Sequence, residues 1–118
     1  MDKVQEILRV LSETIRAHCP YDTGALSQSI ETYYNGGIAQ VVIGNDIVDY
    51  ARITNEPWQK GRNPNEGWVQ RAIDRCLPLI QAIFKGEASQ EEVDKYVNIT
   101  QSAYRLRQQQ RIQEIQAK

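Results

Sequence analysis

Apolar side chains recur at helical spacing near the start of the chain, three or four positions apart, which places them on one helix face. They are Val4, Ile7, Leu8, Leu11 and Ile15. The spacing predicts an amphipathic helix over residues 2–17, and Pro20 prevents its continuation. In the next turn, Asp22 or Thr23 can cap a short helical turn that runs to Ser29.

A two-stranded hairpin is predicted next, because residues 30–34 and 38–44 are rich in β-branched and aromatic side chains around Asn35-Gly36-Gly37. Asn-Gly is the strongest short hairpin signal, since both residues tolerate a positive φ. The alternation predicts that Ala39, Val41 and Ile43 pack on the first helix. Val42 has apolar neighbours, which suggests that the opposite face is partly covered as well.

The pattern does not decide whether residues 46–54 form a short helix or another strand, and residues 55–63 are a polar loop. Asn63-Pro64-Asn65-Glu66 predicts a helix start, with Asn63 as the cap and Pro64 in the first turn. Pro78 kinks this helix and Gly86 ends it. Its apolar stripe comprises Trp68, Ala72, Ile73, Cys76, Ile80, Ile83 and Phe84.

A second capping box, Ser89-Gln90-Glu91-Glu92, opens the last helix, whose apolar spacing weakens after Tyr104. Residues 105–118 carry four basic residues against one glutamate, with five glutamines, and this polar composition predicts an arm that orders only on docking. We therefore expect an α+β core over residues 1–86 and a C-terminal helical arm over residues 87–118. The architecture is an N-terminal helix, an antiparallel hairpin, and a long kinked helix packed on the sheet.

Composition is consistent with one small domain. The chain has 118 residues, 14 basic and 15 acidic, giving a formal charge of −1, so no bulk charge attracts it to nucleic acid or an anionic membrane. The mean hydropathy of −0.57 predicts an exposed arm or a surface that meets polar partners. No apolar run predicts a signal peptide or a membrane span. Two cysteines favour free thiols in a reducing cytoplasm.

Candidate chemistry is sparse. His18 lies beside Cys19, but a Cys-His nucleophile needs a geometry that adjacent residues rarely reach, so we expect His18 to be a helix-end residue. No spacing predicts a metal site, and no motif predicts a nucleotide cofactor. We predict no catalytic, metal or cofactor residues. Trp58 is either a lid on the core or an interface anchor, and both interpretations stay open.

The segment Cys19-Pro20-Tyr21-Asp22-Thr23-Gly24-Ala25-Leu26-Ser27-Gln28-Ser29-Ile30 resembles the "aP-x-DTG-x-L-x-x-SI" block of the tail-component family of tailed bacteriophages, the lambdoid head–tail joining or tail-completion proteins. The order of later elements also matches, over about residues 1–85: a strand ending Val41-Val42-Ile43-Gly44, a Tyr50-Ala51 element, and a loop and helix opening at 61–68. Two places differ: Thr54-Asn55-Glu56-Pro57-Trp58 replaces a glutamate, an aromatic and glycine, and Gly67-Trp68 replaces Pro-Phe.

The motif residues that carry this resemblance are expected to be structural. They are Pro20, Asp22, Thr23, Gly24, Leu26, Ser29, Tyr50, Ala51, Asn63, Pro64 and Trp68. For Asp22 and Thr23, capping preferences favour a structural role over direct partner contact.

The resemblance implies a virion structural protein of the neck, assembled in the host cytoplasm as a ring, often with six subunits. Its implied partners are copies of itself, portal-adaptor proteins and tail-tube proteins, with DNA passing through the lumen but no specific nucleic acid bound and no membrane. We expect the subunit contacts at Trp58, Lys60, Arg62, Arg105, Arg107 and Arg111.

Two other function classes compete with this expectation. A small nucleic-acid-associated regulator would use the basic C-terminal helix to contact phosphates and Trp58 to stack on a base. A solvated helix face explains the arginines better, because no reading motif gathers the positive charge. A cytoplasmic enzyme subunit is the weakest alternative, since the sequence lacks a catalytic set.

Overall fold

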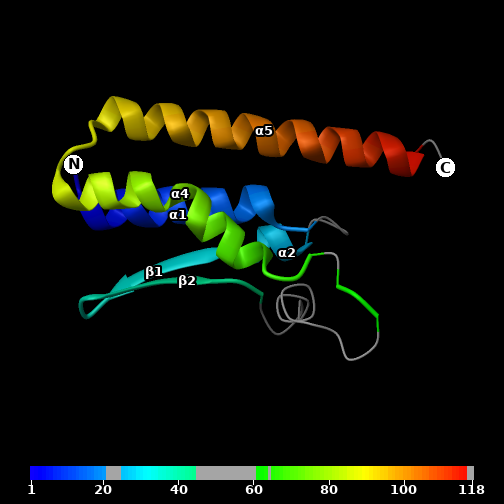
Figure 1. The fold of residues 1–118 in the computed structure, drawn as a ribbon, viewed down its shortest axis with the longest axis horizontal. Helices are drawn as coiled ribbons and strands as arrows, with labels where there is room; N and C mark the ends of the chain where they lie inside the picture. The colour runs from blue at the N-terminus through cyan, green and yellow to red at the C-terminus, as the bar shows by residue number, and fades with distance from the viewer. Residues whose placement is uncertain (21–24, 45–60, 64, 117–118) are drawn as a thin grey trace.

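The computed structural model describes residues 1–20, 25–44, 61–63 and 65–116. Within them, the chain is a mixed α+β protein that is mostly helical, which confirms the predicted fold class (Figure 1). The elements are α1 (Lys3–His18), α2 (Ala25–Gln28), β1 (Glu31–Asn35), β2 (Ile38–Val42), α4 (Trp68–Lys85) and α5 (Gln90–Gln116).

Helix α1 forms where the apolar spacing predicts it. Asp2 is its N-cap, and the carboxylate accepts a hydrogen bond of 3.2 Å from the backbone N–H of Gln5. Such a cap satisfies one of the amide groups that have no partner within the helix. Leu8 and Ile15 of the predicted face are buried, so the amphipathic helix is confirmed, and Val10, which the prediction left out, is buried as well.

The predicted hairpin is also confirmed, but its turn is shifted by one residue. Asn35 pairs with Ile38 at the end of the strands, which leaves Gly36 and Gly37 as the two loop residues. Both glycines have a positive φ, 61° and 80°, as the favoured two-residue hairpin turn requires. A glycine adopts this conformation without the Cβ penalty that Asn35 would incur, which explains the shift.

The hairpin is more exposed than its pattern suggests. Val41 and Ile43 pack against the core, as predicted, but Ala39 is exposed. The prediction that the opposite face is partly covered is wrong for Ile38 and Val42, which are 62% and 41% exposed. The turn of the hairpin diverges from the helices (Figure 1), so only the strand ends nearest α2 reach the core.

Helix α4 begins at Trp68, five residues after the predicted cap. Its N-cap is Gly67, in the left-handed region at φ 77°, with no side-chain capping bond. Asn63 instead organises the preceding turn: its side-chain oxygen accepts from the N–H of Asn65 at 3.0 Å, and its carbonyl accepts from Glu66 at 3.3 Å. The prediction that Asn63 caps the helix is therefore wrong, because Asn63 stabilises the turn before it. Pro64 lies outside the described residues.

Helix α4 runs through Pro78 and bends along its length (Figure 1), as predicted for a helix with a proline inside it. Gly86 ends it with φ 76°, and the Glu87 N–H donates to the Ala82 carbonyl at 2.8 Å. This arrangement is a Schellman motif. The prediction that Phe84 belongs to the buried apolar stripe is wrong, because its side chain is 74% exposed while its neighbour Ile83 is buried.

Helix α5 opens with the predicted capping contact. The Glu92 N–H donates to the Ser89 hydroxyl at 3.1 Å, and that hydroxyl donates to the Glu92 carboxylate at 3.3 Å. The helix then continues to Gln116, so the C-terminal arm is helical over residues 105–116, and its ordering on docking stays a prediction. Val93 and Val97 are buried with the core, which confines the exposed arm to the later turns of α5.

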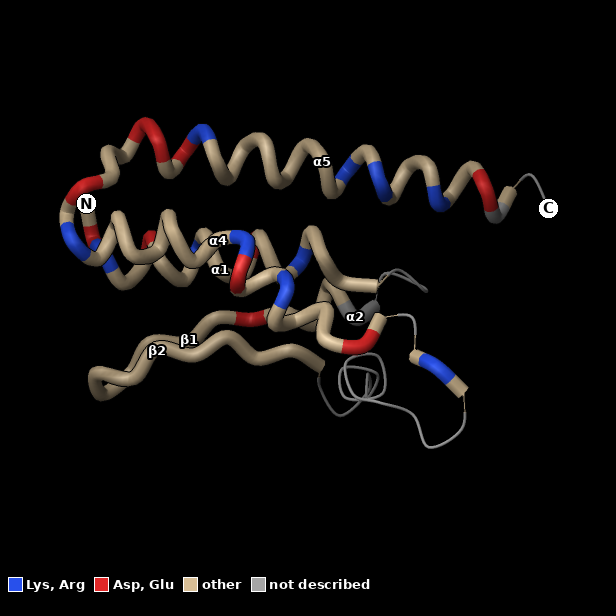
Figure 2. The backbone as a smooth tube through the Cα atoms, viewed as in Figure 1, with Lys and Arg blue, Asp and Glu red and all other residues tan. Residues whose placement is uncertain are grey.

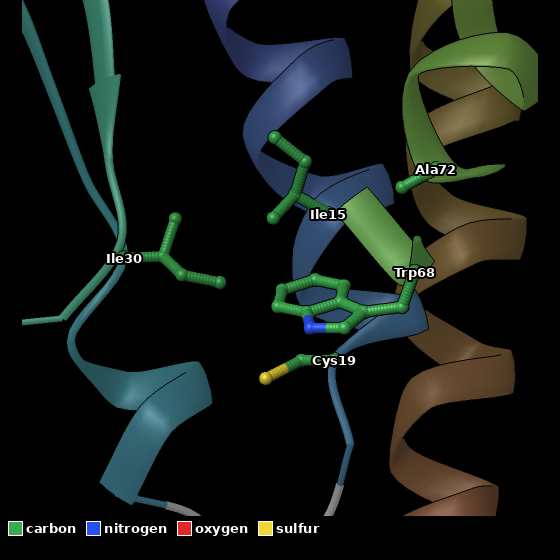
Figure 3. Close-up of a cluster of buried hydrophobic side chains, with 5 residues drawn as sticks. All are labelled: Ile15, Cys19, Ile30, Trp68 and Ala72. Carbon is green, nitrogen blue, oxygen red and sulfur yellow. The ribbon is translucent and has the colours of Figure 1, made fainter. Parts of the chain in front are cut away.

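Two apolar clusters hold the described elements together. In the first, the Trp68 indole lies among Ile15, Cys19, Ile30 and Ala72, joining the hairpin to α1 and α4 (Figure 3). The second joins α1, α4 and α5, and its buried members are Val10, Cys76, Ile83, Val93 and Val97. Helices α1 and α4 contribute to both clusters, and α1 is the central element because α4, α5 and both strands pack against it.

Candidate assembly surfaces

The described motif residues have structural contacts. The Ser29 hydroxyl accepts from the Gly44 N–H at 2.8 Å, which fixes the chain after β2 to the segment before β1. Pro20 accepts through its carbonyl from the Cys19 thiol at 3.6 Å, and Trp68 is 2% exposed in the first cluster. Leu26 lies in α2. The remaining motif residues, other than Asn63, lie outside the described residues: Asp22, Thr23, Gly24, Tyr50, Ala51 and Pro64.

A series of polar contacts joins α5 to α1 and α2. The Thr14 and Tyr96 hydroxyls are 2.7 Å apart, and the Ser27 and Tyr104 hydroxyls are also 2.7 Å apart. Gln108 donates to the Tyr104 hydroxyl at 2.7 Å. We name this series, together with the Arg9 and Arg107 contacts below, the polar seam. Sequence reasoning missed it, although two tyrosines eight residues apart on one helix share a face.

Arg9 forms the end of the polar seam nearest the α4–α5 turn. It donates to Asp94 at 2.7 Å and to Glu6 at 3.0 Å. The hydrogen bond from Arg9 lowers the pKa of Asp94 below its usual 3.8, and a second bond from Gln90 acts in the same direction. The pair is partly exposed, so solvent screening limits its contribution to stability.

Arg107 forms the other end of the polar seam. Its guanidinium donates to the backbone carbonyls of Ala17 and Cys19, at the C-terminal end of α1. These carbonyls lack partners within the helix and lie at the negative end of its dipole. The Arg107 guanidinium supplies both the missing hydrogen-bond donors and a positive charge. Arg107 was predicted as a subunit contact, but here its side chain anchors α5 within the chain.

The other predicted contact residues divide between exposed and undescribed positions. Arg62 and Arg105 are exposed. Arg111 is exposed too and pairs with Glu114 at 3.3 Å within α5. Trp58 and Lys60 lie outside the described residues, so both interpretations of Trp58 stay open.

Two cavities flank the polar seam. One, of about 300 Å³, lies between α1 and α5, and its lining includes His18, Arg75 and Arg107. The other, of about 490 Å³, lies under the last turns of α5, where Arg111 and Glu114 help to line it. The end of α5 is therefore loosely covered by the described part of the chain.

Neither cysteine has the environment of a nucleophile. Burial raises the pKa of Cys19 to about 11, although Arg107 and Arg16 oppose the shift, and burial also raises the pKa of Cys76. Both thiols are therefore protonated at neutral pH. His18 ends α1, as predicted, and its Nδ1 lies 2.9 Å from the Thr14 carbonyl. Among the described residues, no three His, Cys, Asp or Glu side chains gather in a way that could hold a metal.

Large apolar side chains are exposed on three separate surfaces. The hairpin exposes Tyr33, Tyr34, Ile38 and Val42. The end of α4 forms, with α1, an apolar groove of about 290 Å³, which we call the α4-end groove; its lining residues are Ile7, Ile80, Gln81, Phe84 and Lys85. Along α5, the exposed apolar residues are Ile99, Leu106 and Ile112. Contiguous apolar patches mark interaction sites, whereas single exposed apolar residues are ordinary.

Charge is unevenly distributed along α5 and the turn before it, although Lys85 and Lys95 lie near the acidic residues there (Figure 2). Glu87, Glu91 and Glu92 are exposed around its start, whereas its second half carries Arg105, Arg107 and Arg111 against Glu114 alone. The chain's net charge of −1 therefore conceals an acidic excess around the start of α5 and a basic excess in its second half.

Within the described residues, no helix is both long and apolar enough to span a membrane. Comparisons with protein-family models, curated proteins and solved structures found no match for this chain.

Proposed function

We propose that this protein is a structural subunit of the neck of a tailed-bacteriophage virion, a tail-completion, tail-terminator or head–tail connector protein that self-assembles into a ring. The observation that carries the proposal is the exposure of apolar side chains on three separate surfaces of one small domain. Single exposed apolar side chains are ordinary on a monomer, but where several lie together a subunit covers them with its neighbours. The kind of assembly is inferred from the order of motifs in residues 1–85, which resembles that of the tail-component family.

The distribution of charge supports assembly from different surfaces. An acidic end and a basic end on one subunit favour contact between unlike surfaces, and such heterologous contacts close into rings when the rotation permits. In the virion, the ring would join the capsid portal to the tail, with portal-adaptor and tail-tube proteins as its other partners. DNA would pass through the lumen without sequence-specific contacts.

The test is the assembly state of the full chain and its presence in particles. We expect light scattering and negative-stain electron microscopy to show ring-shaped oligomers, often with six subunits. Mass spectrometry of purified virions should detect the chain. A stable monomer under virion-like conditions, together with its absence from purified particles, would contradict the proposal.

The alternative regulator makes a different prediction. Binding through several phosphate contacts would give an affinity for DNA that falls steeply between low and moderate salt. Arg105, Arg107 and Arg111 of α5 are all exposed, but Arg107 already donates to two backbone carbonyls and Arg111 pairs with Glu114. A steep salt dependence would favour the regulator over the neck subunit.

A further inference from the structure

The cavity of about 300 Å³ between α1 and α5, which we call the seam cavity, combines apolar surface with a few polar groups. Ala17, Ile99 and Ala103 line it with apolar atoms, and Tyr96 and Tyr104 line it as well. Small-molecule sites are mostly apolar cavities of this size or larger, in which a few polar groups orient the ligand. The seam cavity therefore has the size and the general character of such a site.

The charged side chains around the seam cavity have one sign. Arg75 of α4 and Arg107 of α5 both line it, and no acidic side chain is among its described lining residues. Like charges repel each other, and the repulsion grows where protein displaces water. An anion bound in the cavity would offset this repulsion. The neighbouring cavity of about 490 Å³ differs, because Glu114 lines it and pairs with Arg111.

Arg75 has hydrogen-bond donors that the fold does not use. Its side chain is exposed and makes no hydrogen bond or ion pair with the described residues. Arg107, by contrast, uses both terminal nitrogens on backbone carbonyls at the end of α1. The His18 Nδ1 donates to the Thr14 carbonyl, since a carbonyl can only accept, so Nε2 has no partner among the described residues. Arg75 thus offers a complete guanidinium group to a ligand.

These donors fit a carboxylate better than a phosphate. A guanidinium group binds both oxygens of a carboxylate in one bidentate pair. The single unused guanidinium satisfies a carboxylate, whereas a phosphate carries more charge and a third oxygen that needs donors. A bare inorganic anion would also leave the apolar lining of the seam cavity in contact with water. The lining therefore favours a carboxylate attached to an apolar body.

We propose that the seam cavity binds a small organic carboxylate with an apolar body, whose anionic group pairs with Arg75 while Arg107 adds positive charge. The site lies within one chain, so the inference goes beyond the proposed function and does not depend on assembly. A ligand there would contact α1, α4 and α5 together. Binding would therefore stabilise the placement of the second half of α5 by mass action.

Titration of the full, isotope-labelled chain with benzoate, followed by nuclear magnetic resonance, tests the site. Benzoate is ionised at neutral pH and has an aromatic body. We expect saturable chemical-shift changes at the lining residues, with a Kd of about 1 mM or lower, which a ligand of this size can reach. Benzamide has the same shape without the charge and should bind about tenfold more weakly or worse. Equal binding of benzamide, or no saturable change with benzoate, would overturn the proposal.

Substitution of Arg75 tests the ion pair without disturbing the fold, because the side chain is exposed and has no described partner. We expect Arg75→Gln to raise the Kd for benzoate about tenfold or more. Arg75→Lys should have an intermediate effect, because an ammonium keeps the charge but loses the bidentate geometry. The matched control is Arg105→Gln, at an exposed arginine of α5 outside the cavity lining, which should leave the Kd unchanged. Equal losses in Arg75→Gln and Arg105→Gln would contradict a specific site.

Three further measurements locate the ligand and define its class. Ala103→Phe should fill the seam cavity and abolish benzoate binding while the circular dichroism spectrum stays unchanged, and binding that persists would place the ligand elsewhere. Inorganic phosphate should bind more weakly than benzoate, and tighter phosphate binding would overturn the carboxylate class. Benzoate should slow hydrogen exchange in residues 105–116, and an unchanged rate would contradict the contact with α5.

The outcomes separate this inference from the proposed function. If the chain forms rings and is present in virions but does not bind benzoate, the ligand site is wrong and the neck function stands. If benzoate binds as expected and the chain is a monomer that is absent from virions, the ligand site stands and the neck function is wrong.

Discussion

The two long helices that pack on α1 are held by different forces. Helix α4 contributes Trp68, Ala72, Cys76 and Ile83 to the buried clusters, spread over most of its length. Helix α5 is longer, yet its fully buried apolar residues, Val93 and Val97, both lie in its first two to three turns. Beyond them, the polar seam holds it.

The apolar contacts of α4 mainly stabilise the fold, whereas the hydrogen bonds of the polar seam mainly position α5. Buried apolar area stabilises by about 25 cal/mol per Å² without directional requirements. A hydrogen bond nets only about 1 kcal/mol, but it fixes the position of its partners. Helix α4 is therefore an essential part of the core, whereas the second half of α5 is accurately placed and weakly held.

The largest expected effect is in the buried apolar clusters to which α4 contributes. Trp68→Ala should lower the free energy of unfolding by about 3–5 kcal/mol, because the indole is 2% exposed and its loss leaves a cavity. Urea denaturation followed by circular dichroism measures the change. Ile99→Ala, at a 61% exposed position of α5, is the control and should change stability by about 0.5 kcal/mol or less. Equal losses in both variants would contradict the assignment of the core.

A smaller, local effect is expected in the polar seam. Tyr104→Phe removes the hydroxyl that contacts Ser27, and Arg107→Gln removes the guanidinium on the α1 carbonyls. Each should cost about 1 kcal/mol. The larger change should be faster hydrogen exchange in residues 105–116, because the end of α5 then opens without global unfolding.

The matched control for this prediction is Arg105→Gln, because Arg105 is an exposed arginine two positions from Arg107. We expect it to leave the exchange rates of α5 unchanged. Uniformly faster exchange across α1, α4 and α5 in the Arg107→Gln variant would show instead that the polar seam is part of the global stability.

The smallest effect concerns the Arg9–Asp94 pair. The pKa of Asp94 is lowered in the folded protein, so its stabilising contribution is fully present above the unfolded value, near 3.8. That contribution is lost as the pH falls through the lower folded pKa. Wild type and Asp94→Asn should therefore differ in stability at neutral pH and converge in strong acid.

Denaturant titrations at several pH values measure this convergence. Glu91→Gln is the control, because Glu91 is exposed and makes no ion pair with the described residues. A stability difference between wild type and Asp94→Asn that persists unchanged into acid would contradict the role of the charged carboxylate.

Much of the fold follows from local patterns. The spacing from Val4 to Ile15 predicts α1, the glycines after Asn35 predict the hairpin, and Gly86 predicts the end of α4. These signals are local because a cap, a turn or a helical face depends on residues within a few positions. The α+β class follows from the same elements.

Other features depended on what lies nearby in space. Asn63 has the sequence of a helix cap, but the helix begins at Trp68, where the indole enters the first cluster. Phe84 adjoins the buried stripe of α4, yet it is exposed because no described element covers that side. Helical spacing predicts which residues share a face, but only the neighbouring elements decide whether that face is covered.

The candidate assembly surfaces show the same division. The sequence alone determined that residues 105–118 are basic and polar, and it placed Arg105, Arg107 and Arg111 among the expected contacts. The tertiary structure decided that Arg107 donates to the carbonyls at the end of α1, about ninety residues away, while Arg105 and Arg111 make no hydrogen bond to another described element. The physical reason is that a hydrogen bond between distant segments requires both to be positioned first, and the apolar packing of α1, α4 and α5 provides that position.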